Sequence, residues 1–214
     1  MQLTITIIHI AGGILALLMG AVALTLRKGG ARHRQTGLWY TAAMVVMALP
    51  GGILSYVLGK PFDVLSSLVA LYMALTGWLA FAPPVKPTIY AMQGGAMLCL
   101  CGYLAVEVYG QQTGVRSTDA PPGAGYVFAG ILALALLGDT RLHRPCTRRQ
   151  ITRRHLWRMN FGLFMACASF FGARPHLFPE WMQTYGILLL LSVAPLGVMA
   201  YWQVRLRNRR SQTV

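Results

Sequence analysis

Seven apolar stretches, each of a length suited to crossing a lipid bilayer, occupy most of this 214-residue chain. A hydrocarbon core of roughly 30 Å takes about 20 apolar residues at a helical rise of 1.5 Å each. Lipid offers no partner to backbone N–H and C=O groups, so each stretch is expected to form an α-helix. The predicted fold is an all-α, polytopic bundle of transmembrane helices. Its spans run over residues 3–26, 37–58, 64–82, 89–109, 123–138, 155–173 and 181–204.

Composition supports this class and argues against a soluble domain. Apolar residues make up 56% of the chain and charged residues 11%, whereas a soluble domain carries about 25% charged residues. Strands of a membrane barrel alternate apolar and polar residues, and the runs at 14–18 and 188–191 do not alternate. The connections between spans are short, so residues 1–214 are predicted to form a single integral-membrane domain.

Positive charge is concentrated on alternate connections between the spans. Fifteen of the 19 lysines and arginines follow the first, third, fifth or seventh span: Arg27, Lys28, Arg32, Arg34, Lys86, Arg141, Arg144, Arg148, Arg149, Arg153, Arg154, Arg205, Arg207, Arg209 and Arg210. The positive-inside rule then places the N-terminus outside and the C-terminus in the cytoplasm, as in a bacterial inner membrane. These basic loops also attract anionic membrane lipids, which is a better interpretation than binding of nucleic acid.

The first span is predicted to stay in the protein, because no basic region precedes it and no small-residue cleavage site follows it. Cys99, Cys101 and Cys167 lie within spans, and Cys146 lies on the cytoplasmic side. Cys99 and Cys101 point about 200° apart on a helix, so they do not form a metal clamp. All four cysteines are expected to pack as small apolar residues, and no metal site is predicted.

His9 is the clearest candidate for a functional group within a span, since an ionisable residue in the membrane is costly. It lies above a stripe of small residues on the same helical face, which includes Gly13, Ala16 and Gly20. One interpretation places haem against this stripe, with the imidazole Nε2 on the iron. The alternative is that the stripe lets two helices approach closely and that a neutral His9 forms a hydrogen bond across them.

The sixth span is the most polar of the seven. His155 is expected near the interface, where its side chain can reach lipid phosphates. Arg158 and Asn160 lie roughly 5–8 Å deeper by helical rise. Because an isolated cation facing lipid at that depth is unfavourable, the Arg158 guanidinium is predicted to point into the bundle and bond to a polar group.

Further polar residues gather at the two ends of the predicted bundle. At the outer end, Glu107, Arg174 and His176 share the height of His9. Glu107 and Arg174 are expected to form an ion pair that closes the bundle, or else to line an outward-facing polar pocket. At the inner end lie His33, His143 and His155, which are surrounded by arginines.

These histidines are candidate ligands for haem. Bis-histidine ligation needs two histidines on different helices at matched depth. His9 has only His176 as a partner, at the end of its span. His33 and His155 are matched in depth but are expected at the membrane interface.

Proline in two spans points to a different function. The second span contains Pro50 followed by two glycines, and the seventh contains Pro195 near Gly197. Proline removes a backbone donor and usually bends a helix. Broken helices expose backbone carbonyls at transporter binding sites, although most transmembrane prolines only kink the helix.

Three motifs resemble a large group of bacterial membrane proteins known as a domain of unknown function. The motifs are His9 with Gly13, an H-R-x-x-G-x-x-Y sequence from His33 to Tyr40, and H-L-W-R-M from His155 to Met159. The third motif is one residue longer than the H-x-W-M of the group, which affects the alignment of Arg158. The resemblance implies a multi-pass inner-membrane protein and supplies no activity.

Three classes of function follow from these observations. The first is a redox component that binds b-type haem or a quinone through His9, His155, Arg158 or His176, with Glu107, Asn160 and Arg174 lining a polar pocket. The second is a small-solute transporter that uses the kinked spans. The third is a structural or accessory subunit of a homo-oligomer or membrane complex. No catalytic residue is predicted, and whether the protein is an enzyme stays open.

Overall fold

The computed structural model is all-α and describes residues 1–82, 85–115, 120–143, 146–172, 175–184 and 186–208. Its α-helices are α1 (Gln2–Thr25), α2 (Ala31–Val57), α3 (Pro61–Trp78), α4 (Lys86–Thr113), α5 (Ala124–Asp139), α6 (Arg148–Cys167), α7 (Glu180–Thr184) and α8 (Ile187–Asn208). Short 3-10 turns follow α3 (η1, Leu79–Phe81) and α5 (η2, Thr140–His143) and precede α7 (η4, Pro175–Leu177). A π-helical turn extends α6 (η3, Ala168–Gly172).

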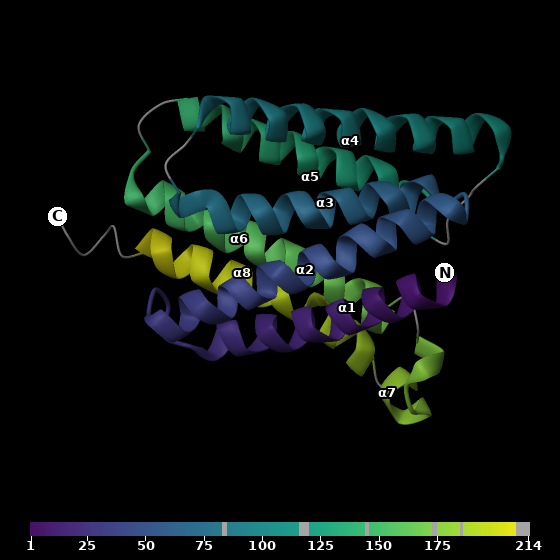
Figure 1. The fold of residues 1–214 in the computed structure, drawn as a ribbon, viewed down its shortest axis with the longest axis horizontal. Coiled ribbons are helices and arrows are strands. Elements are labelled where there is room, and N and C mark those ends of the chain that lie inside the picture. The colour runs from purple at the N-terminus through teal and green to yellow at the C-terminus, as the bar shows by residue number, and fades with distance from the viewer. Residues whose placement is uncertain (83–84, 116–119, 144–145, 173–174, 185, 209–214) are drawn as a thin grey trace.

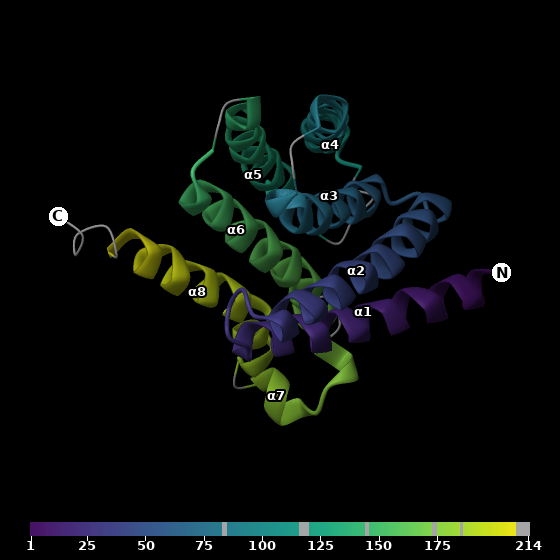
Figure 2. The same ribbon diagram turned by 60° about the vertical axis from the view of Figure 1, so that its left-hand side comes forward.

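The long helices form a bundle whose layers are visible in two views. α4 and α5 make a hairpin along one side, and α3 and α6 lie between that hairpin and the remaining helices α1, α2 and α8 (Figures 1 and 2). The pairs α1 with α2, α2 with α3, α3 with α6 and α6 with α8 pack along one another. The start of α1 and the end of α8 lie at opposite ends of the bundle (Figure 1).

Five helices are long and apolar enough to cross a membrane. They are α1, α2, α3 extended by η1, α4 and α8. α5 is apolar but has only 16 residues, and α6 carries five arginines and is not among the five. The predicted seventh span differs in its start, because α7 is a separate short helix and α8 begins only at Ile187.

The small-residue face of α1 packs against neighbouring helices. A Cβ atom on Gly13 would lie 3.6 Å from the sulfur of Met47 in α2, and one on Gly20 would lie 2.6 Å from Leu163 in α6. Ala16, between them, is fully buried. α2 and α6 therefore cover this stripe, and the idea that a flat cofactor lies against it is not supported.

One end of the bundle collects most of the basic residues, and we call it the basic end. It is the left-hand end in Figure 1, where α1, α3, α5 and α8 finish and where α2, α4 and α6 begin. Of the acidic residues that the structure describes, at positions 63, 107, 139 and 180, only Asp139 belongs to a helix terminus at this end. The alternation of charge along the sequence thus becomes a separation of charge in space.

Candidate functional site at the basic end

The last carbonyl groups of an α-helix have no intrahelical partner, and cations near them are favourable because of the helix dipole. At the end of α1, the Lys28 ammonium donates to the carbonyls of Ala23 and Leu24 at 2.9 and 2.7 Å. The His33 imidazole also reaches the carbonyl of Ala23, at 3.1 Å. Partial burial disfavours the charged ammonium and lowers the pKa of Lys28.

α6 supplies the basic groups that cap the other three helices. At the end of α3, Arg154 donates to the Thr76 carbonyl at 3.0 Å and His155 Nδ1 lies 2.8 Å from the Gly77 carbonyl. Near the end of α5, Arg158 donates to the Ala135 carbonyl at 3.1 Å. At the end of α8, Arg149 donates to the Leu206 carbonyl at 2.7 Å. The N-terminal half of α6 is therefore a polar hub that joins three helix termini.

This polar half is helical because its start is firmly capped. Thr147 accepts a hydrogen bond from the backbone N–H of Gln150 through its hydroxyl. The Gln150 side chain in turn accepts one from the backbone N–H of Thr147, at 2.7 Å. This reciprocal capping box satisfies two N–H groups at the start of α6.

A buried ionic network lies at the centre of this hub. The Arg158 guanidinium lies 2.8 Å from Asp139 Oδ1, and the two side chains are 0% and 1% exposed. Arg154 also pairs with Asp139, at 3.1 Å. Tyr72 donates its hydroxyl to the second carboxylate oxygen at 2.6 Å, and Arg158 donates to the Thr76 hydroxyl at 2.6 Å. The prediction that Arg158 points into the bundle and bonds to polar groups is confirmed.

Two aromatic rings complete the surroundings of Arg158. Its guanidinium carbon lies 4.7 Å from the ring centre of Tyr72 and 5.1 Å from that of Trp157. Such cation–π contacts favour a desolvated guanidinium. The network contains two arginines and one carboxylate. Arg158 bonds to Thr76 of α3 and to Asp139 of α5, and it therefore joins these two helices. Contact with a cofactor, its predicted role, is not tested by this geometry.

Sequence reasoning missed Asp139, Tyr72 and Thr76 as members of this network. The predicted fifth span ends at residue 138, whereas Asp139 is the last residue of α5 and is buried. A signal was present in the sequence. Asp139 is an isolated acid directly before a segment rich in arginine, and an intramembrane arginine needs a counter-charge.

His33 and His155 meet at the basic end from different helices. Their ring centres are 6.4 Å apart with an interplanar angle of 75°, and Phe81 lies 5.2 Å from the His155 ring. Each ring directs Nδ1 at a backbone carbonyl, which can only accept a hydrogen bond. Nδ1 is therefore the protonated nitrogen in the neutral rings, and Nε2 carries a lone pair.

The two motifs that contain these histidines are in contact. Besides the approach of His33 to His155, Tyr40 at the end of the first motif donates its hydroxyl to the backbone carbonyl of Met159 at 3.1 Å. Tyr40 is buried, and its hydroxyl lies 3.0 Å from where a Cβ on Gly162 would stand. The loop-to-helix motif of α2 and the polar motif of α6 thus form one structural unit.

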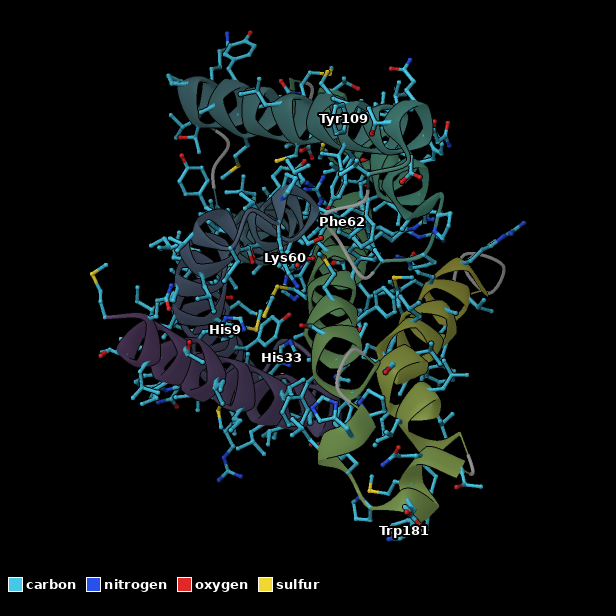
Figure 3. All side chains as sticks on the ribbon, turned by 90° about the vertical axis from the view of Figure 1, so that its right-hand side faces the viewer. His9, His33, Lys60, Phe62, Tyr109 and Trp181 are labelled. Carbon is cyan, nitrogen blue, oxygen red and sulfur yellow. The ribbon has the colours of Figure 1, made fainter. Side chains whose placement is uncertain are left out.

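His9 forms a hydrogen bond across two helices. Its Nδ1 lies 2.7 Å from the carbonyl of Met47 in α2, and a Cβ on Gly51 would lie 2.7 Å from the imidazole (His9 is labelled in Figure 3). The alternative in which His9 forms a hydrogen bond between two closely packed helices is confirmed. In the neutral ring Nε2 is again an acceptor, so it cannot donate to a quinone carbonyl.

The described members of the polar group expected at the opposite end lie on three different elements. Glu107 is 4% exposed and accepts hydrogen bonds from the backbone N–H groups of Gly123 and Gly125, at the start of α5. His176 is exposed in the 3-10 turn before α7, the short helix that carries Trp181 (labelled in Figure 3). Arg174 lies outside the described residues, so its pairing with Glu107 stays a prediction. His9 belongs to the α1–α2 seam instead.

The remaining predicted site residue, Asn160, is buried in α6. Its amide nitrogen donates to the Leu156 carbonyl at 2.7 Å, and its Oδ1 has no hydrogen-bond partner within the described part of the chain. The four cysteines are free thiols. Within the same described ranges, no cluster of three or more His, Cys, Asp or Glu residues is arranged to hold a metal ion.

The fold and the paired charges define a class: an all-α chain with several helices suited to a multi-pass membrane protein. No protein-family profile matches the sequence, and no curated protein or solved structure matches it either. The resemblance to the group of unknown function therefore stays a prediction that is carried by its motifs.

Proposed function

We propose that this chain is a seven-span, single-domain protein of the bacterial cytoplasmic membrane, with its N-terminus outside and its basic end in the cytoplasm. In this arrangement α5 and α6 cross the bilayer together with the five longer apolar helices. The polarity of α6 is compatible with this position, because Arg158 is paired inside the bundle and Arg149, Arg153 and Arg154 lie near the interface. The start of α1 and the end of α8 lie at opposite ends of the bundle, which supports an odd number of crossings (Figure 1).

We further propose that the protein is a membrane redox component that binds b-type haem through His33 and His155. The observation that carries this proposal is that each imidazole is fixed by an Nδ1 hydrogen bond to a backbone carbonyl. This arrangement is the usual one for a metal-binding histidine, because it sets the tautomer and leaves Nε2 as the ligand. His9 has the same tautomer but no second histidine beside it, and His176 is exposed.

The separation of the two rings fits ligation to one iron. Metal–imidazole bonds are about 2 Å long. Two such bonds account for most of the 6.4 Å between the ring centres. The rest matches the distance from each ring centre to its own Nε2, counted once for each imidazole. Haem would supply one-electron transfer, while His33 and His155 would hold and orient it. The tautomers favour haem over quinone, since only the hydroxyl of a reduced quinone can bond to Nε2.

The test is the visible spectrum of protein purified from haem-sufficient cells. Reduced wild-type protein should show the sharp bands of six-coordinate b-type haem. His33→Ala and His155→Ala should each remove them, and the matched controls His9→Ala and His176→Ala should retain them. A wild-type protein that contains no haem and takes up none when it is added would refute the haem proposal.

An accessory role without chemistry is the second candidate. It is supported by the pairing of Asp139 with two arginines and a tyrosine hydroxyl, an arrangement that holds α3, α5 and α6 together. The transporter hypothesis has less support, because α2 continues as a helix through Pro50 and His9 already bonds to the carbonyl of Met47. A protein without haem that co-purifies with a fixed membrane partner would favour the accessory role.

A further inference from the structure

Trp202 in α8 lies between two cations at the basic end. The Lys28 ammonium, from the turn between α1 and α2, is 5.7 Å from the centre of the Trp202 ring. The guanidinium carbon of Arg205 is 5.2 Å from the same centre. Arg205 also donates to the Tyr201 hydroxyl at 2.9 Å. Two segments far apart in the sequence therefore bring positive charge to one indole ring.

Within the described part of the chain, no acid balances the charges of these two cations. In the described part of the chain, Lys28 donates to backbone carbonyls and Arg205 to a phenol, all of which are neutral. Asp139, the acid that ends α5 at this end, is already shared by Arg154 and Arg158. Each cation keeps N–H groups for a further acceptor, because an ammonium has three donors and a guanidinium has five.

We propose that an anionic phospholipid headgroup binds beside Trp202, with its phosphate held by Lys28 and Arg205. Charge complementarity selects the occupant, since arginine and lysine are the usual binding groups for phosphate. The aromatic pair Tyr201 and Trp202 is of the kind that resides at the level of lipid headgroups. Basic pockets between helix ends on the cytoplasmic side are recurrent sites for acidic lipids. The site adjoins the imidazoles of the haem proposal, because Lys28 and His33 share the carbonyl of Ala23, whereas Arg205 comes from α8.

The experiment measures the thermal unfolding midpoint of the full chain in a neutral detergent. Adding phosphatidylglycerol should raise the midpoint by at least about 3 °C relative to phosphatidylcholine, since a ligand that binds only the native state stabilises it. Arg205→Gln and Lys28→Gln should each lose most of this increase. Arg205 is exposed and caps no helix, so its variant separates loss of lipid from loss of folding.

Arg32→Gln and Arg207→Gln are the matched controls, because both cations are exposed at the basic end and neither is near Trp202 in the described contacts. They should keep the full response to phosphatidylglycerol. An equal loss in the controls would mean that the lipid responds only to overall surface charge, which would overturn the site. The same increase produced by inorganic phosphate alone would also overturn a lipid as the occupant. Neither outcome depends on haem.

Discussion

The guanidinium of Arg158 in α6 lies 2.8 Å from the carboxylate of Asp139 in α5, and both side chains are buried. This pair joins the α4–α5 hairpin to the centre of the bundle, and Tyr72 from α3 shares the same carboxylate. A buried pair of this kind is costly to break, because removing one partner leaves an uncompensated charge. Changing only one of the two residues should therefore be strongly destabilising.

Asp139→Asn should destabilise the protein by about 3–5 kcal/mol, because Arg158 and Arg154 then lose their shared counter-charge in a buried position. Arg158→Leu should have a similar effect. The measurement is the unfolding midpoint in detergent, with Arg207→Leu as an exposed arginine control. The double variant Asp139→Leu with Arg158→Met should recover part of the loss, since it removes the fully buried cation together with the carboxylate and leaves Arg154, which is 13% exposed. Equal tolerance of Arg158→Leu and Arg207→Leu would contradict the prediction.

Gly51→Ala should destabilise the seam between α1 and α2 by about 1–3 kcal/mol, the usual cost of overpacking. The reason is that the new methyl group would lie 2.7 Å from the His9 imidazole. His9→Ala alone should cost on the order of 1 kcal/mol through loss of the bond to Met47.

A double variant tests the contact between His9 and Gly51. The double variant His9→Ala with Gly51→Ala should be less destabilised than the sum of the single variants, because the clash disappears. Gly94→Ala, where a Cβ meets nothing within 4 Å, is the control for the glycine change. Strict additivity in the double-mutant cycle would argue against a direct contact between His9 and Gly51.

Glu107→Gln should destabilise the α4–α5 hairpin by about 1–2 kcal/mol. Its carboxylate accepts two backbone N–H groups at the start of α5, where a negative charge also interacts favourably with the helix dipole. The unfolding midpoint of the variant is the measurement. Gln111→Ala, an exposed change in the same hairpin that removes a bond from Tyr126, should have a smaller effect. The reverse order of the two effects would refute a capping role for Glu107.

The orientation of the bundle is tested with single cysteines in a cysteine-free background. Arg148→Cys and Arg207→Cys should react with a membrane-impermeant reagent only after the cells are opened, because the positive-inside rule places the basic end in the cytoplasm. His176→Cys and Lys60→Cys, at the opposite end, should react in intact cells. Labelling of a cysteine at position 148 only from outside would invert the whole arrangement.

The sequence by itself determined the secondary structure and the separation of charge. Long apolar stretches give helices regardless of context, because the backbone must satisfy its own hydrogen bonds in lipid. The sequence also indicated that the Arg158 side chain points into the bundle. Exposing a cation to lipid is costly whatever its neighbours are, so this expectation needs no knowledge of the tertiary structure. The break before Ile187 was missed, because the apolar pattern continues across the short helix α7.

Only the tertiary structure decided which groups meet. The pairing of Arg158 with Asp139, of His33 with His155, and of His9 with Met47 joins residues on different helices, and spacing along one helix carries no information about it. The structure also places His9, Glu107 and His176 of the expected outer group on different elements, because equal depth in a membrane does not mean proximity around the bundle. The basic residues, which the sequence assigned to topology and lipid, additionally cap the helices that end at the basic end, since the last carbonyls of a helix lack an intrahelical partner.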